Sequence, residues 1–326
     1  MARRVQDAPS IPAAKEAPMS PVILHHFDQS PFGEKIRLAL GFKGVAWRSC
    51  RVSRILPRPD LMPLTGGYRR TPVLQIGADV FCDTQIMLRA IEERVPEPSL
   101  LPQGHRGLVH ALAMWTDRAF FQNTVNLVFG SNADAIPQDF IADRTKLRGA
   151  PFNVEAMKAA VPQMRDQFRA HADWIEAQLA GAGDWLLGAF SLADIHAYMN
   201  VWYVRQNLGD AERLLAPFPQ VREWEKRVRG VGHGARTEIG SDEALAIARD
   251  AQPQTPAVAD PGDPNGLTPG QHVTVTPDDY GRIEVAGEIV SSSAQHVAIR
   301  RRDERVGELV VHFPRAGFLV RPATEG

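Results

Sequence analysis

Cysteine is scarce in this sequence, and its scarcity excludes some classes of protein. Only Cys50 and Cys82 occur among 326 residues, so the pattern excludes a disulfide scaffold and favours a reducing, cytoplasmic setting. Long hydrophobic runs are also missing. None reaches the roughly 18 residues that a membrane-spanning helix needs, and the first 20 residues lack the apolar stretch of a secretory signal. We therefore expect no membrane association.

An excess of charge of one sign is missing as well. The chain has 37 Lys and Arg against 38 Asp and Glu, which gives a formal net charge of -1. Nucleic-acid-binding proteins usually show a basic excess, so we expect no nucleic-acid partner. The run Arg300-Arg301-Arg302, with Tyr280 and Phe318, could imitate a nucleic-acid surface, but it is interpreted as a charged hairpin turn.

The first third of the chain alternates between strand-like and helix-like patterns. Ser30-Pro31 is a favoured helix start, because Ser is a preferred N-cap and Pro is preferred at the first helical position. A second helix is expected to start at Asp83-Thr84 and to stop at Pro96. Four strands are expected, at residues 22–27, 46–52, 73–76 and 80–82. This order of elements predicts an α/β thioredoxin-like domain over residues 21–98.

The rest of the chain divides into three further parts. Residues 104–249 carry helical apolar stripes and predict an all-α helix bundle. Five prolines within residues 251–269 predict a linker. Apolar residues then alternate over residues 270–324, which predicts five short strands and a small all-β, SH3-like barrel that docks on the rest. Residues 1–20, rich in Pro and Ala, are expected to be a flexible leader. Deleting residues 251–326 is expected to leave a folded protein.

Three short motifs could carry chemistry. Ser30 lies where the free N–H groups of a helix N-terminus would lower the pKa of a nearby thiol. Thr71-Pro72 precedes a strand, and Asp83-Thr84 starts a helix. Each motif also has a plain structural explanation: Ser30 and Asp83 would be ordinary helix caps, and Pro72 an ordinary trans proline at a strand start.

Together these motifs resemble the glutathione S-transferase family. Ser30-Pro31-Phe32 looks like the motif of its serine-dependent branches, notably the plant tau class. Thr71-Pro72-Val73-Leu74, followed by Asp83-Thr84, looks like the family's cis-proline strand and acidic-hydroxyl pair. In the helical region, Ser191 to Asp194 resembles the family's buried capping box, which is a folding motif. The resemblance covers about residues 21–235.

The resemblance implies a role for each matching residue. Ser30 would be catalytic and face the glutathione sulfur, and Val73, after a cis Pro72, would pair its backbone with the tripeptide. Asp83 and Thr84 would hold the γ-glutamyl group. Arg54, Arg58, Arg69 or Arg70 would meet the glycyl carboxylate, with Arg58 and Arg70 as the chosen candidates. A second-substrate pocket would include Phe32, Trp115 and Arg118.

The predicted function is a glutathione transferase that directs the glutathione thiol at a small electrophile, in a detoxification role. The alternative is a non-catalytic glutathione- or ligand-binding protein on the same fold. Glutathione is the expected co-substrate, and the family implies a homodimer. No metal is expected, because adjacent strand residues His25 and His26 point to opposite faces and other histidines lack ligand spacing. Cys82 is expected to be a buried core thiol.

Overall fold

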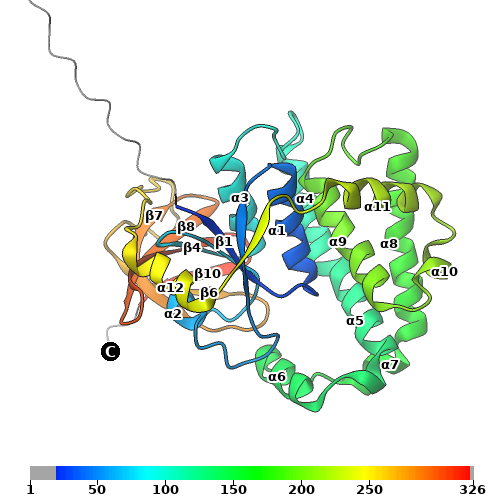
Figure 1. Ribbon diagram of the computed structural model, residues 1–326, viewed down its shortest axis with the longest axis horizontal. Coiled ribbons are helices and arrows are strands. Elements are labelled where there is room, and N and C mark those ends of the chain that lie inside the picture. The colour runs from blue at the N-terminus through cyan, green and yellow to red at the C-terminus, as the bar shows by residue number, and fades with distance from the viewer. Residues whose placement is uncertain (1–19, 324–326) are drawn as a thin grey trace, which may run out of the picture.

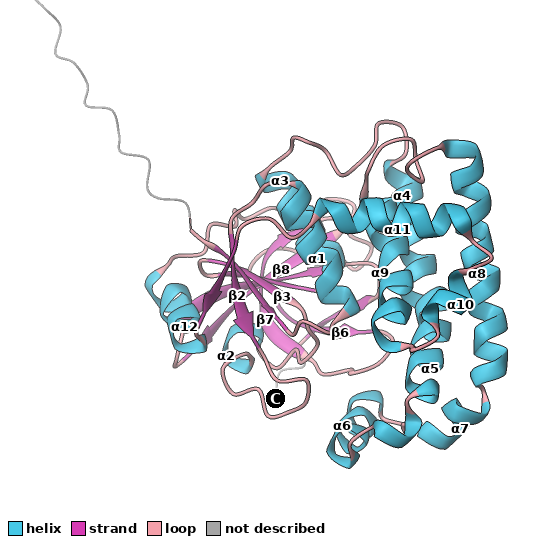
Figure 2. Ribbon diagram, turned by 45° about the vertical axis from the view of Figure 1, so that its right-hand side comes forward, coloured by secondary structure: helices cyan, strands magenta, loops and turns pink. Residues whose placement is uncertain are grey.

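The computed structural model describes residues 20–323, which form a sheet-containing half and a helical half (Figure 1 and Figure 2). The strands gather on one side of the molecule and most helices on the other. The leader predicted over residues 1–20 lies outside the described residues, apart from Ser20. Within the described part of the chain, no helix is both long enough and apolar enough to cross a membrane.

Across the part of the chain that the structure describes, ten strands form a single sheet. In chain order they are β1 (Val22–His26), β2 (Trp47–Arg51), β3 (Val73–Ile76), β4 (Asp79–Cys82), β5 (Arg236–Ile239), β6 (His272–Pro277), β7 (Val285–Ser292), β8 (His296–Asp303), β9 (Gly307–Pro314) and β10 (Phe318–Pro322). Their order across the sheet is β10-β6-β7-β8-β9-β4-β3-β1-β2-β5. The sheet therefore joins the first and last parts of the chain.

The thioredoxin-like part follows the predicted order of elements. Its helices are α1 (Pro31–Phe42), α2 (Met62–Thr65) and α3 (Thr84–Arg94). Strand β1 pairs parallel with β2 and antiparallel with β3. Because successive strand residues face opposite sides, Leu74 packs in the core that contains α1 and α3, whereas Val73 packs in the core that contains α2.

The helical part is also as predicted in type. It contains α4 (Arg106–Met114), the π-helical turn η1 (Trp115–Phe120), α5 (Phe121–Ser131), the short η2 (Ala133–Ala135), α6 (Gln138–Arg148), α7 (Val154–Ala159), α8 (Val161–Ala182), α9 (Leu192–Asn207), α10 (Ala211–Leu215) and α11 (Pro219–Val231). The capping box that begins α9 is confirmed: Ser191 caps the helix and Asp194 reaches back to its backbone. The Trp224 indole N–H also donates to Asp194, at 3.0 Å, which ties α11 to α9.

Residues 236–239 of the predicted helical region form a strand of the sheet instead. Strand β5 pairs parallel with β2, and α12 (Ser241–Asp250) packs beside it. The buried Gln75 amide donates to the carbonyl of Ala244 in α12, at 2.9 Å. Strand β5 has the sequence Arg-Thr-Glu-Ile, which lacks the alternation of apolar and polar residues that marks a strand. It is an edge strand, and its charged side chains are open to water. The prediction of an all-helical region to residue 249 is therefore wrong for β5.

The five predicted C-terminal strands are present, but they continue the main sheet. Strands β6–β10 pair antiparallel with one another, and β9 pairs parallel with β4. The outer strands β10 and β9 do not pair with each other in the described residues, so a closed SH3-like barrel is not confirmed. Side chains of this C-terminal sheet, such as Val275 and Phe313, share one core with Val73, Val80 and Cys82. Burial of Cys82 agrees with its interpretation as a core thiol.

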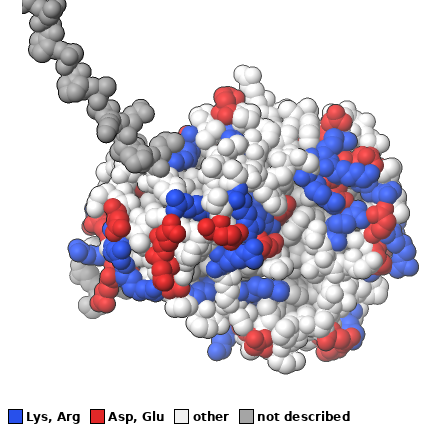
Figure 3. All heavy atoms as spheres, viewed as in Figure 1, with Lys and Arg blue, Asp and Glu red and all other residues white. Residues whose placement is uncertain are grey.

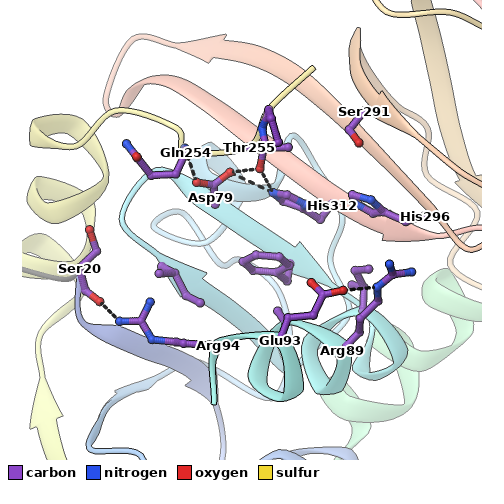
Figure 4. A pocket seen from close by; sticks show the side chains of 15 residues that line it. Ser20, Asp79, Arg89, Glu93, Arg94, Gln254, Thr255, Ser291, His296 and His312 are labelled. Carbon is purple, nitrogen blue, oxygen red and sulfur yellow. Dashed lines mark hydrogen bonds and ion pairs between the residues drawn. The ribbon is translucent and has the colours of Figure 1, made fainter. Parts of the chain in front are cut away.

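A polar cluster fastens the β4–β9 junction (Figure 4). The carboxylate of Asp79 on β4 lies 3.0 Å from His312 Nε2 on β9, and it accepts from the Gln254 backbone N–H and the Thr255 hydroxyl. His312 Nδ1 lies 3.0 Å from His296 Nε2. Burial alone would raise the pKa of Asp79, but these hydrogen bonds outweigh it and hold the pKa below its ordinary value. The segment predicted as a linker is thus anchored where it crosses β4.

Deleting residues 251–326 should destabilise the thioredoxin-like part rather than leave it intact. The deletion would expose Val73, Val80 and Cys82 and remove the partner of strand β4, which would become an unpaired edge. We expect loss of a cooperative thermal transition or aggregation, measured by circular dichroism and sedimentation. A truncated chain that melts within a few degrees of the full chain would show that the module is separable, as the sequence alone suggested.

Two adjacent histidines on β1 are buried with polar partners. His25 Nε2 lies 2.8 Å from Gln75 Oε1, and His26 Nε2 lies 3.0 Å from Ser49 Oγ. Burial lowers the pKa of His25 to about 4, and burial with the nearby Arg37 guanidinium lowers the pKa of His26 to about 3. Their packing between ordinary polar partners agrees with the sequence-based interpretation.

The free energy of unfolding should therefore fall as the pH drops below about 6.5, the pKa of an unfolded histidine. The unfolded chain takes up protons there that the folded chain excludes until its own lower pKa values are reached. Each histidine should contribute a slope of about 1.4 kcal/mol per pH unit between those limits. Urea titrations from pH 7.5 to 5 should show this. His25→Gln should flatten the dependence, whereas His105→Gln, at an exposed position, should leave it unchanged.

Candidate functional site

One cavity is lined by all three parts of the chain. Its volume is about 650 Å³. The thioredoxin-like part contributes the start of α1, the segment before β3 and the start of α3, while the helical part contributes η1, α5 and α6. The turn between β6 and β7 adds Asp279 and Tyr280, and the turn before β10 adds Gly317. The C-terminal strands therefore reach the cavity as well as the sheet.

Ser30 opens on this cavity at the N-terminus of α1. Its side-chain oxygen accepts from the Gly33 N–H at 3.0 Å, so Ser30 caps the helix as its sequence position indicates. A hydroxyl can accept and donate at once, and within residues 20–323 its O–H has no acceptor. Capping therefore leaves the hydroxyl proton available to a ligand in the cavity. The positive end of the α1 dipole favours negative charge at the same place.

The peptide bond between Thr71 and Pro72 is cis, as predicted. Thr71 and Pro72 line the cavity, whereas Val73 does not. Val73 is fully buried and lies between partners in β1 and β4, so its backbone faces neighbouring strands. Thr71, and not Val73, is therefore the residue of this segment that faces the cavity beside Pro72.

Asp83 and Thr84 face the cavity from the N-terminus of α3. Asp83 caps the helix by accepting from the Gln85 N–H at 2.9 Å, and Thr84 is the first helical residue. Asp83 has φ 91°, the single positive value at a non-glycine residue in the described chain. Such a conformation is strained for a side-chain-bearing residue, and strain of this kind gathers at ligand sites.

The carboxylate of Asp83 has no cationic partner within ion-pair distance among the described residues. Burial in the cavity wall raises its pKa, an effect that the Gln85 N–H partly offsets. A cation bound in the cavity would reverse that shift. Asp83 is thus a half-buried acid whose environment suits an ammonium group.

The two candidate arginines of the glutathione site differ in what they can do. All three guanidinium nitrogens of Arg58 donate to the carbonyls of Ser53, Arg54 and Arg69, so this side chain braces its own loop. Arg70 forms an ion pair with Asp279 and lies 4.0 Å over the Tyr280 ring. Both line the cavity, and Arg70 ties the cavity rim to the C-terminal sheet.

The residues predicted for a second-substrate pocket separate in the structure. Phe32 lines the cavity and packs edge-on against Phe121, with ring centroids 4.8 Å apart. Arg118 also lines it and forms an ion pair with Asp278 at 3.2 Å. Trp115 does not line the cavity. Its ring stacks on Phe120 and its indole N–H donates to His171, because its helix turns that side chain toward α8.

Several lining residues could not be found from the sequence. Tyr280 comes from the turn between β6 and β7 and Phe318 from the start of β10, and Asp117 is held by the fully buried Lys35 at 2.7 Å. No local pattern marks them, because only the β4–β9 pairing and the packing of η1 against α1 bring them here. Among the described residues, no three His, Cys, Asp or Glu side chains are grouped as metal ligands would be.

Two family models match this chain. Residues 24–99 match the glutathione S-transferase N-terminal domain, and residues 158–227 match the glutathione S-transferase C-terminal domain. The first match includes Ser30, Pro72 and Asp83, and the second includes the Ser191–Asp194 capping box. Both fall on the parts of the chain where the sequence motifs predicted them.

Individual proteins support the same assignment. A GST-like protein from Pseudomonas syringae is 38% identical with a TM-score of 0.78, and the match covers 94% of this chain and all of that one. A match of that extent continues into the C-terminal strands. FtsZ-localized protein A of Caulobacter vibrioides is 31% identical over 180 residues, which are 53% of this chain and 73% of the relative.

A more distant structure shows the fold alone. A glutathione S-transferase from Rhodospirillum rubrum is 24% identical with a TM-score of 0.52, over 64% of this chain and 87% of that one. The order of elements, the cis proline, the two helix N-termini at one cavity and these matches agree. The chain belongs to the glutathione S-transferase family.

Proposed function

We propose that this protein binds glutathione in the cavity between its three parts and activates the thiol for attack on a small electrophile. The observation that carries the proposal is the meeting of two helix N-termini at one cavity, one capped by Ser30 and the other by Asp83. Two such N-termini suit a ligand with a thiolate at one place and a carboxylate at another.

Each end of glutathione has a partner of matching chemistry. Asp83 would bind the γ-glutamyl ammonium, and the N–H groups that begin at Thr84 would bind the adjacent carboxylate. The backbone of Thr71, before cis Pro72, would pair with the tripeptide in place of Val73. Arg58 or Arg70 would attract the glycyl carboxylate. The Arg58 guanidinium is engaged by three carbonyl groups, and Arg70 would have to exchange its ion pair with Asp279 for the ligand.

Ser30 would assist the chemical step. Its hydroxyl would donate to the glutathione sulfur, and a donor that bonds the thiolate more strongly than the thiol lowers the thiol pKa. The thiol proton goes to solvent. The thiolate then forms a C–S bond with the electrophilic carbon, and a leaving group departs with its electron pair. Phe32 and Arg118 would line the electrophile's side of the cavity. The two free, buried cysteines suit a reducing, cytoplasmic setting, and detoxification is the proposed role.

Ser30→Ala should slow conjugation about tenfold to a hundredfold near neutral pH while leaving glutathione affinity nearly unchanged. A hydrogen bond to a charged group contributes about 1.5–3 kcal/mol, so its loss raises the thiol pKa by about one to two units. Asp83→Asn keeps a side chain that can cap α3 but removes the charge, so it should weaken glutathione binding instead. Calorimetry with glutathione and turnover of an aryl halide separate the two effects.

Ser30→Ala also removes a helix cap, so the experiment needs a matched control. Asn153 caps α7 in the same way, through the Ala156 N–H at 2.9 Å, and it does not line the cavity. Asn153→Ala should cost a similar stability of about 1 kcal/mol and leave turnover unchanged. Equal thiolate absorbance curves against pH for wild type and Ser30→Ala, with equal turnover, would show that Ser30 is only a cap.

We further propose a two-fold homodimer, which the family implies. The helical part leaves Leu108 on α4 and Trp174 on α8 exposed, at 47% and 57% of their surface, and exposed apolar side chains of this size suit a protein contact. Light scattering at micromolar concentration should give twice the 35.9 kDa chain mass. Leu108→Asp should lower the measured mass if α4 lies in the contact. A monomer mass for the wild type would contradict the proposal.

The second candidate is a ligand-binding protein without transferase activity. Two observations favour it. The Caulobacter relative is named for its localization with FtsZ rather than for a reaction. The turn with Asp278 and Asp279 also pins Arg118 and Arg70 across the cavity rim, which would restrict a second substrate. Glutathione binding without turnover of any aryl halide or epoxide would favour this candidate.

A further inference from the structure

The cavity has a second charged end, away from Ser30, and we infer that Arg144 and Arg148 of α6 form a subsite there for the anionic group of the second ligand. That ligand would have an apolar or aromatic body and would carry a carboxylate or another anionic group at its far end. The inference rests on the proposed function, because it assigns the ligand class of the same cavity.

The apolar floor of this subsite is one face of α5. Phe121, Val125 and Phe129 all line the cavity and are four residues apart, so they lie on the same side of the helix. Phe121 contacts Phe32, beside Ser30. Phe129 lies at the other end, with ring centroids 5.6 Å from Phe140 and 5.2 Å from Phe152. At about 1.5 Å per residue, this stripe extends about 12 Å from the thiol end.

The far end of the stripe is basic. The guanidinium of Arg144 lies 4.6 Å over the Phe140 ring, and that of Arg148 lies 5.6 Å over the Phe152 ring. Both arginines line the cavity. Within residues 20–323, Arg148 has no hydrogen bond and no ion pair, and the nearest carboxylate to Arg144 is Asp143, at 3.9 Å. Arg148 is thus held against an aromatic ring with no carboxylate partner, and Arg144 has only a long ion pair with Asp143, which already pairs with Arg69.

Neighbouring arginines increase the excess of positive charge at this end of the cavity. Arg54, Arg58 and Arg69 lie beside Arg144, and the one carboxylate among them, Asp143, is already paired with Arg69 at 2.5 Å. Burial, together with Arg144 and Arg69, lowers the pKa of Arg58 to about 10, as expected for guanidinium groups that repel one another. A bound anion would relieve this repulsion.

The excess of positive charge is local to the cavity. Seven arginines line it against three aspartates, whereas the whole chain is nearly neutral and the face seen in Figure 3 mixes both signs. The three aspartates are committed elsewhere: Asp117 to Lys35, Asp279 to Arg70, and Asp83 to the proposed ammonium site. Arg54, Arg58, Arg69 and Arg70 are the candidates for the glycyl carboxylate. Arg144 and Arg148, on the helical part, remain for a second anion.

The test compares two glutathione conjugates that differ only in charge. One is the S-conjugate of 4-chloro-3,5-dinitrobenzoyl-4-aminobutyrate, whose tether ends in a carboxylate; the other is its primary amide. Calorimetry on the full-length protein should show at least tenfold tighter binding of the acid, a preference that shrinks as salt rises. Binding of preformed conjugates needs no turnover, so the result does not depend on catalysis.

Three arginine variants test which side chains cause the preference for the acid conjugate. Arg148→Met removes the charge, breaks no hydrogen bond or ion pair among the described residues, and keeps an apolar side chain against Phe152; it should reduce the preference for the acid to about threefold or less without changing affinity for the amide. Arg144→Met should act in the same direction. Arg169→Met, on exposed α8 and outside the cavity, is the matched control and should change neither affinity.

Two results would overturn the inference. Equal binding of acid and amide by the wild type would refute it while leaving the proposed function intact, provided that glutathione itself binds. A preference that survives in the Arg144→Met, Arg148→Met double variant would also refute it, because the anion would then be held elsewhere. Failure of glutathione and both conjugates to bind would refute the proposed function and this inference together.

Discussion

The parallel pairing of β9 with β4 is the constraint on which the rest of this structure depends. In the absence of that pairing β4 would be the edge of a short sheet, and the apolar face formed by Val73, Val80 and Cys82 would need another cover. The pairing converts two small sheets into one and buries that face against Val275, Phe313 and their neighbours. A five-stranded module too small to hold a large core of its own thus shares one.

The same junction determines the shape of the candidate site. Because β9 pairs beside β4, the C-terminal strands extend the sheet of the thioredoxin-like part. The turn between β6 and β7 then reaches the cavity. There Asp278 and Asp279 bind arginines from two different parts of the chain, Arg118 and Arg70. The module is therefore part of the wall of the cavity, and a ligand bound there would contact a rim that the first 250 residues do not supply.

Inside the cavity, both backbone groups and side chains contribute to the electrostatic potential. Two helix N-termini create fixed positive potential at Ser30 and at Thr84, and Asp83 places one carboxylate at the second of them. The arginines of α6 and of the loop before α2 add positive charge, and Asp143 is the one carboxylate beside them among the described residues. This distribution of charge suits a ligand whose anionic groups lie at the helix N-termini and the arginines and whose one cationic group lies at Asp83.

Much of this could be predicted from the sequence, because local patterns specify local structure. Ser30-Pro31 and Ser191 to Asp194 begin helices through hydrogen bonds to residues two to four positions away, so the signal lies in adjacent residues. The thioredoxin-like order of elements, the helical region and the five C-terminal strands follow from periodicity in the same way. The family motifs also indicated Ser30, Pro72 and Asp83, which the fold brings to one cavity.

What the sequence could not determine was contact between distant segments. Strand β5 is charged and short, so only its pairing with β2 makes it a strand. Trp115 and Arg118 are three residues apart, yet packing against α8 turns one away from the cavity and leaves the other in its wall. The sequence alone determined which elements form and which family motifs they carry. Only the tertiary structure decided that β9 pairs with β4 and that Tyr280, Arg144 and Arg148 face one cavity, because such contacts depend on long-range packing that no local pattern records.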